Sequence, residues 1–149
     1  MTTPGPETDD EFEQEPEVEE PALYSISFDR LAELKRSAVV LIAQRRVPTC
    51  PSLDTPTHEL ADPQALVEEI AEHCEDEEGF IRTGMSIQEI AFRLLLSRRN
   101  RPMSLADLHH ELTETWSTPA HTVNVSQQGL QRVLEADTYY GFARVPDRS

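Results

Sequence analysis

A helix signal that begins at Ser86 limits the fold of this chain more than any other pattern. Glu89 follows Ser86 by three residues, the capping-box spacing in which each side chain satisfies the other residue's backbone donor. Apolar residues then recur at the i, i+3, i+4, i+7 and i+8 positions of one helix face, namely Ile87, Ile90, Ala91, Leu94 and Leu95. Because an apolar helix face must pack against other elements, the sequence predicts a core-facing helix over 87–96.

A second helix is expected after the polar run 97–102, which ends the first one. Ser104 with Asp107 repeats the capping pattern and opens this helix. Its apolar face is formed by Leu105, Leu108, Leu112 and Trp116. The register of Trp116 with the leucines favours a place at the edge of the core over an exposed anchor for a partner.

A third helix and a strand complete this part of the chain. Asn124 and Gln127 have capping-box spacing and predict a helix that runs to about Asp137. Residues 139–145 are rich in strand-forming side chains. The order of the elements is that of a helix-turn-helix followed by a wing.

Residues 86–145 resemble the HARE-type winged-helix domain, which is also found at the N-terminus of the delta subunit of bacterial RNA polymerase. The segments that carry the resemblance are the first helix, the turn 101–105, residues 118–124 before the third helix, and the wing strand 142–145. The resemblance implies a winged-helix fold and a role beside RNA polymerase or DNA. A two-stranded wing would recruit its second strand from elsewhere in the chain, for which the region of Val123 is one candidate.

The region before residue 81 is expected to be helical. Leu31, Leu34, Ala38, Leu41 and Ile42 follow a helix period and predict one helix over 28–46. The proline-rich segment 48–62 predicts a linker or surface loop, and Asp62 with Pro63 opens a helix that reaches Cys74. Residues 80–82 could form a short strand.

Charge is distributed unevenly along the chain. The 149 residues have a formal net charge of −15, and residues 1–20 contain nine acidic side chains and no basic one. The remaining residues have nineteen acids and thirteen bases, a net of −6. A segment with this much charge and so few apolar residues does not offset its ordering entropy, so 1–22 is expected to be a disordered acidic tail.

The expected architecture is therefore mainly α. A disordered acidic N-terminal tail (1–22) precedes a helical N-terminal region (23–80), and a winged-helix, helix-turn-helix domain with a short C-terminal β-strand follows (81–149). A chain of this length accommodates one domain with appendages.

Candidate binding residues lie on two features of the winged-helix-like part. Glutamine and arginine side chains on the third helix have the chemistry to read base edges, and the basic turn after the first helix has forked donors that suit phosphates. Each feature also has a non-functional explanation. The polar side chains of the third helix could form a solvated surface, and the cations of the basic turn could stabilise the C-terminal end of the helix dipole. The nucleic-acid or partner-binding candidates are Arg98, Arg99, Arg101, Gln127, Gln128, Gln131, Arg132 and Arg144.

Other functional classes find little support in the sequence. Cys50 and Cys74 form no CxxC pair, and the histidines lack the paired spacing of zinc sites, so neither a metal nor another cofactor is expected. There is no familiar catalytic motif, so an enzyme is not expected. No leader or membrane span is apparent, which predicts a soluble cytoplasmic protein.

Two functions remain as hypotheses. The first is a non-catalytic, transcription-associated accessory protein that binds RNA polymerase, DNA or both, with the acidic tail modulating nucleic-acid binding. The alternative is a protein–protein adaptor or oligomerisation module that uses the helices over 28–46 and 63–74 and contacts no nucleic acid.

Overall fold

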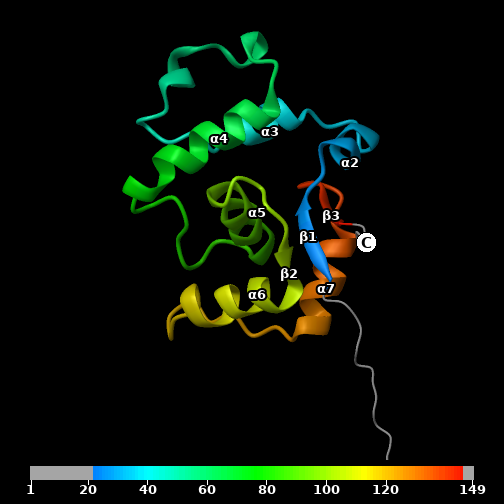
Figure 1. The fold of residues 1–149 in the computed structure, drawn as a ribbon. Helices are drawn as coiled ribbons and strands as arrows, with labels where there is room; N and C mark the ends of the chain where they lie inside the picture. The colour runs from blue at the N-terminus through cyan, green and yellow to red at the C-terminus, as the bar shows by residue number, and fades with distance from the viewer. Residues whose placement is uncertain (1–21, 146–149) are drawn as a thin grey trace, which may run out of the picture.

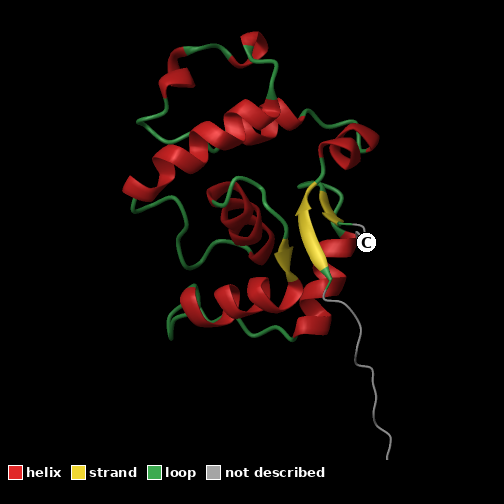
Figure 2. Cartoon of the chain, in the orientation of Figure 1, coloured by secondary structure: helices red, strands yellow, loops and turns green. Residues whose placement is uncertain are grey.

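The computed structural model describes residues 22–145, so the predicted acidic tail (1–22), apart from Ala22, lies outside the described part of the chain. Helices dominate these residues, and one small antiparallel sheet lies among them (Figures 1 and 2). The prediction of a mainly helical chain with a short strand near its C-terminal end is thus confirmed.

The elements have the following bounds. The α-helices are α2 (Phe28–Glu33), α3 (Ala38–Ala43), α4 (Pro63–His73), α5 (Ile87–Ser97), α6 (Leu105–His110) and α7 (Gln127–Ala136). The strands are β1 (Leu23–Ile26), β2 (Met103–Ser104) and β3 (Phe142–Arg144). The short 3-10 turns are η2 (Pro51–Asp54), η3 (Thr57–Glu59) and η4 (Cys74–Asp76), and α6 continues into a wider π-type turn, η5 (Glu111–Thr115).

The sheet has the strand order β2-β1-β3, so its central strand comes from the N-terminal region. In β1, Tyr24 lies opposite Met103 of β2 on one side and Arg144 of β3 on the other, and both pairings are antiparallel. The strand that accompanies β3 is therefore β1, and not a segment near Val123, which lies in a loop. Local sequence did not reveal this pairing because it joins residues more than one hundred positions apart.

Asn100 fastens β1 to the end of α5. Arg99 and Asn100 both have positive φ, of 60° and 58°, and this left-handed turn aims the Asn100 amide at β1. The Ile26 backbone N–H donates to Oδ1 of Asn100 at 2.8 Å, and Nδ2 donates to the Ile26 carbonyl at 2.8 Å. The Asn100 side chain thus bonds the backbone of Ile26, which lies beyond the two residues of β1 that pair with β2.

Substituting Asn100 with alanine should lower the free energy of unfolding by about 2 kcal/mol, because two backbone groups of β1 lose their partners and alanine disfavours the left-handed turn. Urea unfolding followed by circular dichroism measures this loss. Asn124→Ala is the matched control, since Asn124 is exposed in a loop and should change stability by less than about 0.5 kcal/mol. Equal effects of the two substitutions would contradict the role of Asn100.

The single helix expected over 28–46 is wrong, because the chain turns between α2 and α3. Lys35 has φ 62°, and the Arg36 N–H donates to the Leu31 carbonyl at 2.9 Å, as in a left-handed helix C-cap. Ser37 then caps α3 by accepting from the Val40 N–H. The apolar period continues across this break, so periodicity could not show it.

The predicted helix starts are mostly confirmed. Asp62, Ser86 and Ser104 cap α4, α5 and α6 through their side-chain oxygens. The start of the third helix is wrong by two residues, because Ser126 and not Asn124 accepts from the Gly129 N–H and caps α7. Residues 80–82 form no strand.

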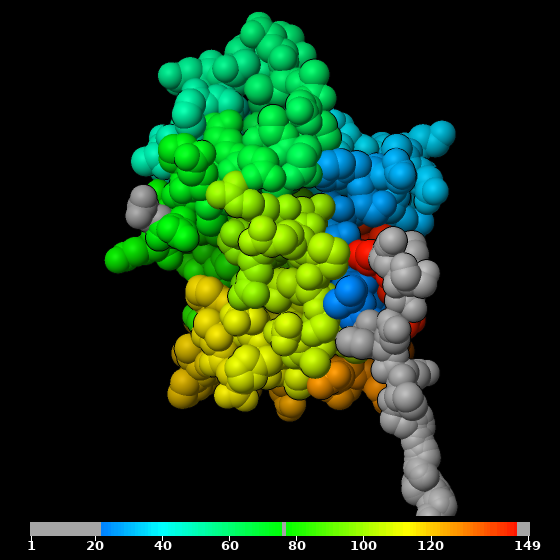
Figure 3. Space-filling model, in the orientation of Figure 1, coloured from blue at the N-terminus to red at the C-terminus, as the bar shows by residue number. Residues whose placement is uncertain are grey.

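One hydrophobic core spans both predicted regions. Helices α3 and α4 lie across α5 on one side, whereas α6 and α7 lie on the other (Figure 1). The buried cluster includes Ile42, Val67 and Ile70 from the N-terminal region together with Phe92 and Leu134 from the C-terminal region. Figure 3 shows the regions before and after residue 80 as one continuous mass. The two regions therefore share one hydrophobic core.

Candidate functional site

The basic turn after α5 is largely paired with acidic side chains. A guanidinium nitrogen of Arg98 lies 3.4 Å from a carboxylate oxygen of Glu111, and Arg99 forms an ion pair with Glu68 of α4. Arg101 is exposed and has no ion pair within residues 22–145. Because two of the three cations are partnered, the turn offers less free positive charge than its sequence suggests.

The exposed face of α7 is polar and nearly neutral, because it has one basic and one acidic side chain, Arg132 and Glu135. Gln127, Gln128 and Arg132 are exposed, and Gln131 is half-buried. Glu135 on the same helix accepts a hydrogen bond from the Tyr24 hydroxyl at 2.6 Å. Arg132 has no ion pair within residues 22–145, but a single guanidinium supplies little of the phosphate neutralisation on which DNA affinity depends.

Arg144 lies on the sheet beside α7. It is exposed on β3 and stands opposite Tyr24 in the strand register. Strand β3 contacts α7, and the Tyr24 hydroxyl of the adjacent β1 reaches Glu135 of α7. Arg144 and the predicted α7 residues therefore lie on neighbouring elements. The Val145 N–H donates to the Leu23 carbonyl at 2.7 Å, which extends the contact between β1 and the end of β3.

A shallow apolar groove runs along α7. Its volume is about 520 Å³, and its lining includes Val125, Gly129, Val133 and Ala136. Gln88 from the start of α5, Arg132 from α7 and Asp137 after α7 also border it, so one cation and one acid lie at its edge. Sequence reasoning missed this groove, because the lining residues come from α5, α7 and the loop before α7.

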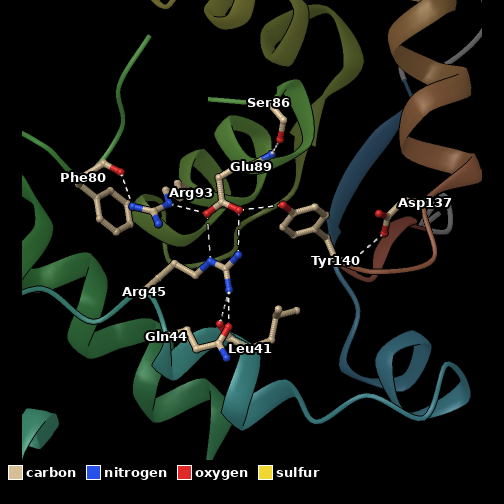
Figure 4. Close-up of polar contacts among 9 residues, drawn as sticks. All are labelled: Leu41, Gln44, Arg45, Phe80, Ser86, Glu89, Arg93, Asp137 and Tyr140. Atoms are coloured by element: carbon tan, nitrogen blue, oxygen red, sulfur yellow. Dashed lines mark hydrogen bonds and ion pairs between the residues drawn. The ribbon is translucent and has the colours of Figure 1, made fainter. Parts of the chain in front are cut away.

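A buried polar cluster centred on Glu89 joins three parts of the fold (Figure 4). Arg45 binds the carboxylate with two hydrogen bonds, of 3.0 and 2.8 Å, and Arg93 donates to it at 2.6 Å. The Tyr140 hydroxyl donates to the same carboxylate at 2.8 Å. Glu89 of α5 therefore connects its helix to the turn after α3 and to the segment before β3. Its side chain does not close the capping box that its spacing predicted.

The turn at Gly141 holds Tyr140 over Glu89. Asp137 accepts hydrogen bonds from the backbone N–H groups of Tyr140 at 2.8 Å and Gly141 at 3.0 Å. Gly141 has φ 82°, and a Cβ atom there would lie 2.5 Å from Cγ of Leu31. Both the left-handed backbone and the close approach require glycine.

The electrostatics of the cluster keep the Glu89 carboxylate charged at neutral pH. Burial by itself would raise its pKa, but the hydrogen bonds from Arg45, Arg93 and Tyr140 outweigh burial and lower the pKa to about 2. Burial, followed by the contact with Glu89, raises the pKa of Tyr140 to about 12. Neither group would exchange a proton near neutral pH, so the cluster suits a structural role and not general acid–base chemistry.

The cysteine and histidine side chains of residues 22–145 form no metal centre. Cys50 and Cys74 are buried free thiols, and burial raises the pKa of each. Among residues 22–145, histidine, cysteine and carboxylate side chains do not cluster as metal ligands do. Trp116 packs against the core, and its indole N–H is buried without a hydrogen-bond partner in the described chain.

The part of the chain that the structure describes has no helix with the length and apolar character needed to cross a membrane. Comparisons with protein-family models, with curated proteins and with solved structures find no match to this chain.

Proposed function

We propose that this chain is a non-catalytic, transcription-associated accessory protein whose winged-helix-type domain docks on RNA polymerase through α7. The succession α5, β2, α6, α7 and β3 supports the winged-helix plan, and β1 supplies the strand that the wing needs beside β3. The link to RNA polymerase rests on the resemblance of residues 86–145 to HARE-type domains.

The mainly polar, nearly neutral face of α7 beside an apolar groove is the observation that carries this proposal. Interfaces between proteins have apolar centres bordered by polar groups, and charged side chains are depleted from these centres. Gln127, Gln128 and the groove around Val133 and Ala136 fit this description. Direct reading of duplex DNA fits less well, because Arg98 and Arg99 are paired with Glu111 and Glu68.

Fluorescently labelled full-length chain should be titrated with bacterial RNA polymerase core enzyme and, separately, with duplex DNA, at about 50 mM and about 200 mM salt. We expect saturable binding to the polymerase, with a Kd that changes less than about threefold between the two salt concentrations because apolar contacts are weakly screened. Failure to bind the polymerase, or DNA binding that falls steeply with salt, would overturn the proposal.

The substitution Ala136→Glu tests whether α7 is the docking face. It places a charge at the apolar groove and should raise the Kd for the polymerase at least about tenfold. Ala106→Glu is the matched control, since Ala106 is an exposed alanine of α6 and should leave the Kd within about twofold. Equal affinities of the two variants would place the interface elsewhere.

A further inference from the structure

Four arginine side chains border one hollow between the turn after α3, the loop before α5, and α5 itself. The hollow has a volume of about 260 Å³, and its lining includes Arg45, Arg46, Arg82 and Arg93 together with Glu77. We infer that this arginine hollow binds a phosphoryl group of a small anionic ligand.

Two of these arginines are held in place by the core. Arg45 is 8% exposed, and its guanidinium binds Glu89, the Leu41 carbonyl and the Gln44 side chain. Arg93 binds Glu89 through Nε and the Phe80 carbonyl through one terminal nitrogen. Both guanidiniums also lie near aromatic rings, with Arg93 5.3 Å from the centroid of Phe80. A binding group that is already ordered loses little entropy when a ligand arrives.

The other two arginines retain free donors. Arg46 uses Nε and one terminal nitrogen for backbone carbonyls of residues 43–55, which leaves its second terminal nitrogen without a partner in the described chain. Arg82 is exposed, and its side chain makes no hydrogen bond or ion pair with residues 22–145. The second terminal nitrogen of Arg93 is likewise unpaired within this range. Guanidinium donors that border one hollow suit the oxygens of a phosphoryl group.

The charge of the arginine hollow matches such a group. Four guanidiniums are offset by Glu77 in the lining and by Glu89 behind Arg45 and Arg93, which leaves a formal charge of +2. A phosphate monoester has a charge of roughly −1.5 to −2 at neutral pH. The site is notable in a chain whose formal net charge is −15.

The surrounding surface favours a ligand with more than one phosphoryl group. Gln44 borders the arginine hollow and also a second hollow of about 240 Å³, which Lys35 and Arg36 line. Residues 34–50 contain these two cations together with Arg45 and Arg46 and no acidic residue. A polyphosphate that fills the arginine hollow can therefore extend across Gln44 toward further positive charge.

Nitrogen–proton correlation spectra of the full chain, titrated with inorganic phosphate or with ATP at constant ionic strength, test the inference. We expect saturable shifts of the amide signals around residues 44–47 and 79–82, with ATP binding at least about fivefold more tightly than phosphate because it reaches the second hollow. Saturation by ATP alone would support a nucleotide as the source of the phosphoryl group. No saturable shift with either probe would overturn the inference.

The substitution Arg82→Glu separates this site from general attraction of anions. The Arg82 side chain makes no contact that the fold needs within the described chain, so the variant should fold and should bind ATP at least about tenfold more weakly. Arg101→Glu changes the charge equally at an exposed position outside the hollow and should alter the Kd less than about twofold. Equal losses in the two variants would show nonspecific attraction and would contradict the site.

Discussion

Replacing Glu89 with glutamine should lower the free energy of unfolding by about 3–5 kcal/mol, the range found when one partner of a buried ion pair is removed. The side chain of Glu89 is 15% exposed, and that of Arg45 is 8% exposed. Glutamine keeps the volume of glutamate but leaves the Arg45 guanidinium buried without a counter-charge. The glutamine amide would also face the donors of Arg45, Arg93 and Tyr140 either with its own N–H group, which cannot accept, or with a carbonyl oxygen that accepts more weakly than a carboxylate.

Equilibrium unfolding in urea, followed by far-ultraviolet circular dichroism, measures this loss. Glu111→Gln is the matched control because it removes the same charge from an ion pair with Arg98, whose side chain is 44% exposed. We expect the control to cost less than about 1 kcal/mol, since exposed pairs contribute little. If Glu89→Gln lowered the free energy of unfolding no more than Glu111→Gln does, the polar cluster around Glu89 would not stabilise the fold.

The second large effect is a loss of stability in acid. A carboxyl group with a lowered pKa contributes stability above its unfolded pKa and loses this contribution as the pH falls through the folded value. For Glu89 these values are 4.5 and about 2, so the loss should occur between about pH 4.5 and pH 2. Its size should be about 3 kcal/mol, from 1.36 kcal/mol for each unit of pKa.

Urea unfolding at a series of pH values, for the wild type and for Glu89→Gln, isolates this contribution. The wild type should lose stability more steeply than the variant below pH 4.5, because the variant has no carboxyl group at the centre of the cluster. The two curves should therefore converge toward about pH 2. Parallel curves over this range would show that other carboxyl groups cause the acid sensitivity.

The local pattern of residues was enough to predict most helices. Capping side chains and the helix period act over a few positions, so the starts at Asp62, Ser86 and Ser104 could be predicted from neighbouring residues. The break between α2 and α3 could not, because the apolar period is the same on both sides of Lys35. The shift of the α7 start to Ser126 has a similar cause, since several polar residues nearby can act as caps.

The candidate sites were harder to predict than the helices. The polar side chains of α7 were identified from their spacing, and the structure places Gln127, Gln128 and Arg132 on its exposed face. The basic turn was identified as a source of positive charge, but its partners Glu68 and Glu111 lie on other elements. The arginine hollow was missed because its residues come from three separated segments. The lack of acids over residues 34–50 was the one signal that could have indicated it.

Residue spacing alone therefore specified a helical chain with an apolar face on each main helix and a strand near its end. Contacts between distant segments specified the rest. The chain brings β1 between β2 and β3, and it directs Glu89 to Arg45 and Tyr140 instead of to its own helix cap. Helix periods and caps follow from interactions within one or two turns, whereas strand pairing and buried ion pairs depend on which segments the hydrophobic core brings together.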